Sequence, residues 1–441
     1  MPALAAFLPL STMQIYRRQQ RPQRAAREET LKKIAAIALA TTSLGLAALT
    51  LPALAETKNE VIHWWTSGGE SAAVKVFADQ FTKAGGTWVD TAIAGGANAR
   101  TAAINRVIGG KPPTAMQFNT GKQFDELVAG GMLADIDSVA QEGNWAKIMP
   151  AAIVAAASRN GKFYAVPVNI HGQNWLWYNK AVFESAGAKE PATVDELFTA
   201  LDKIKAKGLV PLAFSGQKNW ERGLFNTILL AKGGNELYEA VYSKRDAKAA
   251  ASPAFKDVAE AYGKLRAYVD QGAPGRNWND ATAMVIQGKA GMQVMGDWAK
   301  GEFIGAGLTA GKEYGCTVIG QGYMMGGDVF AFAKTSDPEQ VAAQKLLAKT
   351  MLDKQTQILF AQKKGSVPVR NDVDISSLDA CAQTGMKMLA DPKRQAAAVE
   401  MLAPASFNGA LEDIISEFWN KKDMDAGAFT AKFGKTMAEA L

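Results

Sequence analysis

The stretch EVIHWWTSGGESAAVKVFADQFTKAG, residues 60–85, sets the pattern that the rest of the chain follows. Its first six residues favour a β-strand, and Phe77 and Phe81 then recur at the spacing of one helix face. Neighbouring side chains of a strand point to opposite faces, so Trp64 and Trp65 cannot both enter one core layer. We expect one of them to face a ligand, and the sequence leaves open which one.

The alternation of strand and helix continues along the chain. Residues 87–95 (TWVDTAIAG) and 114–119 (TAMQFN) read as strands, whereas 99–110 and 121–131 read as helices. This βαβαβ order favours a mainly parallel sheet with helices on both faces. Ligands of such sheets bind outside the carboxyl ends of the strands, where Asn119 falls together with the two tryptophans.

The later part of the chain has the same α/β character. Residues 193–208 (TVDELFTALDKIKAKG) predict a helix with a threonine cap and an acidic first turn, and residues 209–216 predict a strand. The length suffices for two domains, and the chain shows no internal repeat or long linker. We therefore expect two halves packed together, with short crossings between them.

The formal net charge of +6 comes almost entirely from the N-terminal segment. Residues 1–55 hold seven basic and two acidic side chains, which leaves a net charge of +1 on the rest. A nearly neutral body lacks the basic surface that nucleic acid requires, so we expect no nucleic-acid partner.

Residues 31–55 have the features of a cleavable signal peptide. Two lysines precede an apolar stretch that ends in the small-residue pattern Ala53-Leu54-Ala55. We predict cleavage after Ala55 and export of a freely diffusing protein. A membrane anchor is the alternative, but the small-residue end is typical of a signal-peptidase site.

Cys316 and Cys381 are the only two cysteines. An even pair in an oxidising compartment favours a disulfide, and two buried free thiols are the alternative. With only two histidines, His63 and His171, and two scattered cysteines, the chain shows no clustered zinc pattern.

The glycine-rich segments do not fit nucleotide binding. Neither residues 94–100 nor residues 288–297 match a Walker loop or a dinucleotide fingerprint, so we expect no cofactor. Glycoside hydrolases use two carboxyl groups, for which Glu70 and Asp297 are candidates. The sequence does not give the separation of these groups, so a secreted hydrolase stays open as an alternative.

Several tryptophans lie close to polar side chains in the sequence. Aromatic rings pack against the C–H face of a sugar ring, while carboxylates, amides and lysines bind its hydroxyl groups. Packing in the core is the alternative for each tryptophan and is favoured for Trp298. The Ser-Gly-Gly before Glu70 is expected to let the chain turn, so that this carboxylate joins the site. The tryptophans concerned are Trp64, Trp65, Trp175, Trp177, Trp220, Trp278 and Trp298.

Four motifs resemble one protein family. The chain is similar to the periplasmic glucose/mannose-type sugar-binding proteins of bacterial ABC importers (extracellular solute-binding protein family 1). The motifs are VIHWWTSGGE (61–70), AVPVNIHGQNWLWYNK (165–180), NWNDATAMVIQGKAGMQVMGDWAK (277–300) and KKGSVPVRND (363–372). The resemblance spans about residues 58–440 and implies two α/β lobes in a type II-like arrangement, each with a mainly parallel sheet, joined by a hinge.

The resemblance also implies how the chain is divided. Residues 1–55 form the N-terminal extension and signal peptide, residues 56–166 and 321–365 the N-lobe, and residues 167–320 and 366–441 the C-lobe.

Motif by motif, the resemblance places a sugar between the lobes. The CAQT motif at Cys381 is similar to the same family and implies pairing with Cys316. Two departures, Asn119 in place of a lysine and Phe407-Asn408 in place of a histidine, remove hydroxyl-binding groups of a glucose site. They point to a different hexose, a glycoside or a disaccharide. The implied ligand-binding residues are Trp64, Trp65, Glu70, Asn119, His171, Gln217, Trp220, Trp278, Asp297 and Lys364.

The resemblance thus implies a non-enzymatic transport function. A monomeric periplasmic protein would close on a glucose/mannose-type hexose or small glycoside about a hinge near Val166–Asn169 and Ile319–Tyr323. It would deliver the sugar to permease subunits in the inner membrane. ATP hydrolysis would occur elsewhere, in keeping with the missing nucleotide motif. The alternatives are the glycoside hydrolase and a binder of polyamines or another non-sugar solute.

Overall fold

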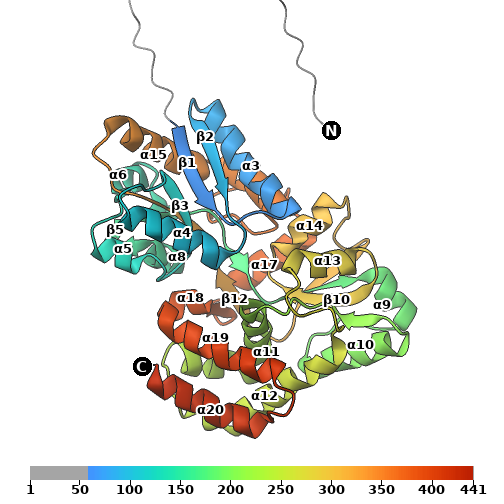
Figure 1. Cartoon of the computed structure of the whole chain (residues 1–441). Helices are drawn as coiled ribbons and strands as arrows, with labels where there is room; N and C mark the ends of the chain where they lie inside the picture. The colour runs from blue at the N-terminus through green and yellow to red at the C-terminus, as the bar shows by residue number, and fades with distance from the viewer. Residues whose placement is uncertain (1–57, 441) are drawn as a thin grey trace, which may run out of the picture. The chain divides into compact units, whose positions relative to one another are not determined.

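The structure of the chain is a computed structural model that describes residues 58–440 (Figure 1). The predicted signal peptide and its cleavage site after Ala55 lie outside the described residues. Among residues 58–440, no helix is both long and apolar enough to cross a membrane.

The first sheet, which defines the N-lobe, has the strand order β2-β1-β3-β13-β6. Strands β2, β1 and β3 are parallel, as the βαβαβ pattern predicts, but β13 is antiparallel to both of its neighbours. Local periodicity does not encode the direction of β13, because this strand returns from a distant part of the chain. The strands are β1 (Lys58–His63), β2 (Thr87–Ala92), β3 (Ala115–Asn119), β6 (Ala165–Pro167) and β13 (Asp328–Phe332).

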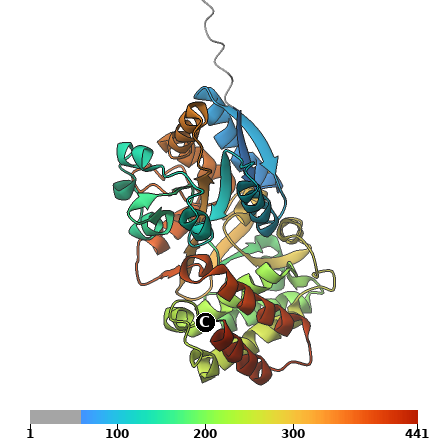
Figure 2. The same cartoon turned by 60° about the vertical axis from the view of Figure 1, so that its left-hand side comes forward.

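Helix α3 (Gly68–Lys83) follows β1 and buries one apolar face against the N-lobe sheet and its covering helices. Ser67 caps its first turn, and Phe77 and Phe81 are fully buried, as their spacing predicts. Each such phenylalanine stabilises the fold by roughly 1.5–3 kcal/mol through the apolar area it removes from water. Helices α15 (Pro338–Met351) and α16 (Lys354–Lys364), orange in Figures 1 and 2, pack on α3 although they come late in the chain.

The second sheet, which defines the C-lobe, has the order β11-β8-β10-β9. Only β9 and β10 pair in parallel, so this sheet is mixed and not mainly parallel as we expected. The reason is that β8 lies between two antiparallel partners, β10 and β11, that arrive more than a hundred residues later. The strands are β8 (Trp175–Asn179), β9 (Val210–Leu212), β10 (Ala290–Met295) and β11 (Tyr314–Val318).

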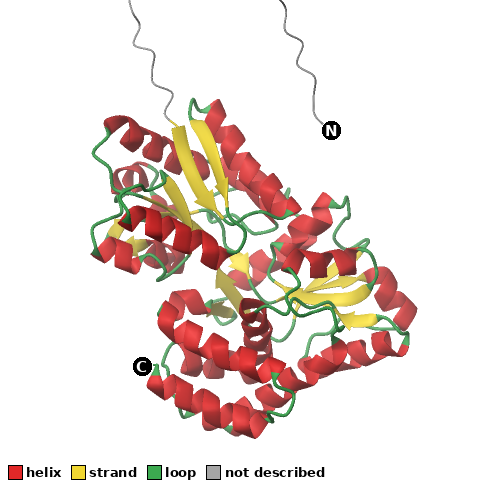
Figure 3. Cartoon of the chain, in the orientation of Figure 1, coloured by secondary structure: helices red, strands yellow, loops and turns green. Residues whose placement is uncertain are grey.

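Helices cover the C-lobe sheet, and further helices pack on these to form a helical layer (red in Figure 3). Helix α10 (Val194–Ala206) begins at the predicted threonine, Thr193, which forms a capping box with Glu196. Trp175 and Trp177 of β8 are both fully buried, so they serve core packing. The other main helices of this lobe are α11 (Lys218–Tyr242), α12 (Pro253–Leu265), α19 (Ala405–Asn420) and α20 (Ala426–Glu439).

A small third sheet, β14-β12-β7, lies where the chain crosses between the lobes. The chain leaves the N-lobe sheet after Pro167 and re-enters it at Asp328, immediately after Gly327. A third segment runs alongside, because Ile170 and Val367 form an isolated β-bridge. The strands are β7 (His171–Gly172), β12 (Tyr323–Gly326) and β14 (Gln395–Ala397).

The predicted disulfide is present. Cys316 of β11 and Cys381 of helix α17 (Ala380–Leu389) are bonded, with 6.1 Å between their Cα atoms. The cap residue of α17, Asp379, also accepts an ion pair from buried Lys300 at 2.7 Å. Both contacts fasten the segment that follows α16 to the C-lobe.

Candidate binding cleft

A cleft of about 710 Å³ lies between the carboxyl ends of the N-lobe strands and the C-lobe. Nine of the ten predicted ligand-binding residues line it, although they come from six separate segments of the chain. Asp297 does not line the cleft and lies behind it. The nine are Trp64, Trp65, Glu70, Asn119, His171, Gln217, Trp220, Trp278 and Lys364.

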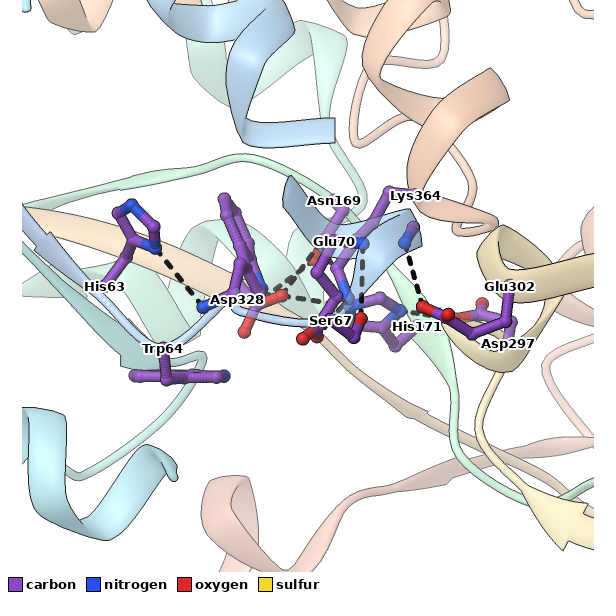
Figure 4. A network of polar contacts seen from close by, with 12 residues as sticks. His63, Trp64, Ser67, Glu70, Asn169, His171, Asp297, Glu302, Asp328 and Lys364 are labelled. Carbon is purple, nitrogen blue, oxygen red and sulfur yellow. Dashed lines mark hydrogen bonds and ion pairs between the residues drawn. The ribbon is translucent and has the colours of Figure 1, made fainter. Parts of the chain in front are cut away.

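The two adjacent tryptophans have different roles. Strand β1 ends at His63, so both follow the strand, yet they still face in different directions. Trp65 is only 1% exposed and packs against Phe77, Phe330 and Phe360. Trp64 is half-buried and lies at the cleft, at one end of the network in Figure 4. Trp64 is therefore the ring that has a surface to offer a ligand.

The Ser-Gly-Gly after these tryptophans is part of a tightly packed helix start. The hydroxyl of Ser67 accepts the backbone N–H of Glu70 at 3.3 Å. A Cβ atom on Gly69 would lie 2.6 Å from the backbone of Gly301 in helix α14 (Ala299–Gly305). The N–H of Gly69 also donates to the carboxylate of Glu302 at 2.9 Å. Glycine is needed here for the close approach of two helices, and not for the flexible turn we expected.

Glu70 and Lys364 form a buried ion pair. The Nζ atom of Lys364 donates to Oε1 of Glu70 at 3.0 Å, and the two side chains are 2% and 8% exposed. The same ammonium group lies 5.6 Å from the ring centre of Trp65 and 5.9 Å from that of Trp298. The pair is thus held between aromatic rings of both lobes.

His171 lies between two carboxylates where the lobes meet. Its Nδ1 bonds to Asp297, and its Nε2 lies 2.9 Å from Oδ2 of Asp328. Burial disfavours a charged imidazole ring, but the two carboxylates outweigh this effect and raise the pKa of His171 to about 9. Burial likewise acts against ionised Asp328, yet the bond from His171 leaves the pKa of this carboxyl lowered. Both ring nitrogens of His171 are occupied by the protein.

Both carboxylate oxygens of Asp297 are also hydrogen-bonded to the protein. Its Oδ1 accepts from His171, and its Oδ2 accepts the backbone N–H of Gly172 at 2.8 Å. Its side chain is 4% exposed, and its position behind the cleft explains why only its partner His171 lines the cavity.

Asn119, the last residue of β3, presents an amide at the N-lobe edge of the cleft. Its carbonyl oxygen accepts from Gln123 at 3.1 Å and from Arg100 at 3.4 Å. The guanidinium of Arg100 also stacks on Trp64, 5.6 Å from the ring centre. Asn119 is thereby connected to Trp64 through Arg100.

The C-lobe wall carries three half-buried tryptophans. Trp220 lies in the first turn of α11, Trp278 is the first residue of α13 (Trp278–Ile286), and Trp298 follows β10. The rings of Trp220 and Trp298 lie 5.7 Å apart at 44°. Trp298, which we expected in the core, also lines the cleft. Gln217 approaches the start of α13 through a bond of 3.3 Å to Asn277.

Sequence reasoning missed a second charged group of the cleft. Arg222 pairs with Glu400 at 2.9 Å and with Glu412 at 3.2 Å. Burial disfavours the charge of Arg222, but these carboxylates leave its pKa raised, while burial raises the pKa of Glu412. Asn408 lines the same region, whereas Phe407 is in the core. No local signal marks Arg222 and Glu400 as partners, because they are 178 positions apart.

The carboxylates that line the cleft are all paired with cations of the protein. Glu70 has Lys364, Asp328 has His171, and the two glutamates of the C-lobe share Arg222. Among residues 58–440, no group of three side chains is arranged to hold a metal ion. The arrangement can bind an uncharged, hydroxyl-rich molecule between aromatic and polar walls.

Two α/β lobes, each built on a sheet with covering helices, enclose a polar and aromatic cleft. This arrangement defines a two-lobed binding protein. Residues 77–403 match the family described as bacterial extracellular solute-binding protein. The chain belongs to this family of binding proteins, and it is not an enzyme.

Relatives at the sequence level have names that describe sugar binding. A probable sugar-binding periplasmic protein of Rhizobium meliloti (strain 1021) is 38% identical over 392 residues, 86% of this chain and 94% of the relative. A protein of the same description from Brucella suis biovar 1 (strain 1330) is 38% identical over 405 residues, 88% and 94%.

A solved structure supports the fold. A chitin oligosaccharide binding protein superposes with a TM-score of 0.74 at 18% identity and covers 86% of this chain and 98% of its own. At this level of identity the likeness concerns the two-lobed fold alone.

Proposed function

We propose that this protein captures a neutral sugar in the cleft and delivers it to the permease of a bacterial ABC importer. The observation that carries the proposal is the combination of half-buried tryptophans on both walls with carboxylates that are already paired with cations of the protein. Tryptophan rings suit the C–H face of a sugar ring, and amides and ion-paired groups suit its hydroxyls. The names of the relatives from Rhizobium and Brucella agree with this ligand class.

The charge pattern argues against a cationic ligand such as a polyamine. A cation needs carboxylates that are free to pair with it, yet each carboxylate lining the cleft already has a protein partner. The cleft volume of about 710 Å³ lies inside the range of roughly 300–1,000 Å³ for small-molecule sites. We infer a hexose or a small glycoside, with the region of Arg222 and Asn408 available to a second ring.

The pairing also argues against a glycoside hydrolase. Catalysis would require one of Glu70 and Asp297 to act as a proton donor and the other as a base or nucleophile. Glu70 is held by Lys364, and Asp297 is held by His171 and Gly172. Both carboxyl groups are thus already bonded to groups of the protein, and Asp297 does not line the cleft.

Closure of the lobes about the crossing segments would enclose the sugar. A ligand that contacts both walls favours the closed state by its differential affinity for that state. We further propose the lobe boundaries given above, cleavage of the signal peptide after Ala55, and a monomer in the periplasm. The mass of the exported protein, measured by mass spectrometry, tests the cleavage site.

Titration calorimetry of the exported protein against monosaccharides, disaccharides and spermidine tests the ligand class. We expect binding of at least one sugar and none of spermidine, and the opposite result would refute the proposal. Trp64→Ala should lower sugar affinity at least tenfold, since it removes the N-lobe ring on which the sugar ring would pack. Trp88→Ala is the matched control, because Trp88 is also a half-buried N-lobe tryptophan but lies away from the cleft.

A further inference from the structure

A chain of hydrogen bonds runs from the half-buried Trp64 to the crossing segments. The backbone N–H of Trp64 donates to Oε1 of Gln117 at 3.0 Å. Nε2 of Gln117 donates to Oδ1 of Asp328 at 3.1 Å, and Oδ2 of Asp328 accepts from Nε2 of His171 at 2.9 Å. Figure 4 shows part of this network, with Trp64 at one end and Asp297 at the other.

Gln117 occupies an unusual position for an amide. It is the central residue of β3, is 1% exposed, and does not line the cleft. A buried amide costs stability unless both of its ends are bonded, and an apolar residue would suit the middle of this strand better. Its oxygen must face the N–H of Trp64 and its nitrogen must face the carboxylate of Asp328, so its orientation is fixed.

The network meets the opposite wall at His171. The rings of His171 and Trp298 form a T-shaped pair with 5.1 Å between their centres, and Trp298 in turn contacts Trp220. The connected residues therefore join the aromatic group of the N-lobe wall to that of the C-lobe wall. The distance between these walls decides which ligand can touch both of them.

We propose that Gln117 is a positioning residue that fixes Trp64 relative to the crossing segments and thereby sets sugar affinity without touching the sugar. This inference rests on the proposed function. Substitution of Gln117 should loosen Trp64, because its backbone N–H follows the end of β1 and finds its partner in this side chain.

The first test compares Gln117→Met with Gln344→Met. Gln344 is a matched control, since it is a buried amide of the same lobe that bonds to Thr114 and Ala333 away from the cleft. We expect about tenfold weaker sugar binding for Gln117→Met, corresponding to the loss of one or two buried hydrogen bonds, and unchanged binding for Gln344→Met. Equal affinities of the two variants would overturn the proposal.

The second test is Gln117→Glu, measured between pH 5 and 7.5. A protonated carboxyl can reproduce both bonds of the amide, whereas an ionised one repels Asp328. Sugar affinity of this variant should recover as the pH falls, while the affinity of Gln117→Met stays low. A purely structural role would give no such pH profile in the affinity, and a flat profile at the wild-type level would contradict our inference.

A third readout does not depend on any sugar. Fluorine NMR of the protein labelled with 5-fluorotryptophan gives one resonance per tryptophan, and Trp64→Phe identifies that of Trp64. This resonance should shift or broaden in Gln117→Met and stay in place in Gln344→Met. If the wild type binds no sugar, the proposed function fails, while this measurement still decides whether Gln117 positions Trp64.

Discussion

The two walls of the cleft are built in different ways. The N-lobe wall includes residues 64–70, which also anchor the lobe through the buried ring of Trp65 and the ion pair of Glu70. The C-lobe wall is assembled from half-buried rings on separate segments, such as Trp220 and Trp298. A wall that is also part of the core cannot change without loss of stability, whereas a wall of half-buried side chains can change ligand with little effect on the fold.

The largest expected effect concerns stability at the base of the N-lobe wall. Trp65→Ala should lower the free energy of unfolding by about 3–5 kcal/mol, because it leaves a cavity among Phe77, Phe330 and Phe360. Trp220→Ala should lower it by only about 1 kcal/mol, since this ring is half-buried. Urea denaturation of both variants measures the difference, and equal losses would remove the contrast between the walls.

The buried ion pair of the N-lobe wall should be the next most sensitive feature. Lys364→Met leaves the carboxylate of Glu70 buried without its cation, which should cost about 3 kcal/mol. The double variant Lys364→Met/Glu70→Leu should regain most of that loss, because no unpaired charge remains. Lys435→Met, which removes an exposed pair with Glu439, is the control and should leave the unfolding midpoint unchanged. A single variant as stable as the control would contradict the prediction.

The smallest effect is expected where the two walls meet, at His171. Its raised pKa of about 9, compared with 6.5 in an unfolded chain, means that its protonated form stabilises the fold. This contribution is complete below about pH 6.5 and is lost as the pH rises through about 9. Between pH 7 and 8.5 the protein should lose about 2 kcal/mol from this group.

Proton NMR can follow this titration directly, because the chain has only two histidines. His63→Gln assigns the remaining signal to His171, whose midpoint we expect near pH 9. A midpoint at or below 6.5 would show that the two carboxylates do not hold a charged ring between the walls.

Much of the fold follows from local patterns in the sequence. The strand and helix order of the N-lobe, the cap at Thr193 and the buried face with Phe77 each depend on residues a few positions apart. The disulfide between Cys316 and Cys381 was within reach because the chain has no other cysteine. The direction of β13 could not be predicted from the sequence, since its neighbours in the sheet come from segments more than a hundred residues earlier.

The candidate site could likewise be predicted in part from the sequence. Residues at predicted strand ends, such as Trp64 and Asn119, reach the cleft because parallel strands bring their carboxyl ends to one edge. Arg222 and Glu400 were missed, because an ion pair between helices carries no pattern that distinguishes a cleft from solvent.

The sequence by itself determined the class of fold and the near-neutral charge of residues 56–441, because periodicity, capping and composition act through near neighbours or need no contacts at all. Its motifs also indicated an aromatic and polar binding site through their family resemblance. Only the tertiary structure decided that Trp65 enters the core while Trp64 faces the cleft, and that Gly69 serves a close helix contact. It also decided that Glu70 meets Lys364 across 294 positions. Such choices depend on which distant surfaces pack together, and the burial of a charge is tolerated only where that packing supplies its partner.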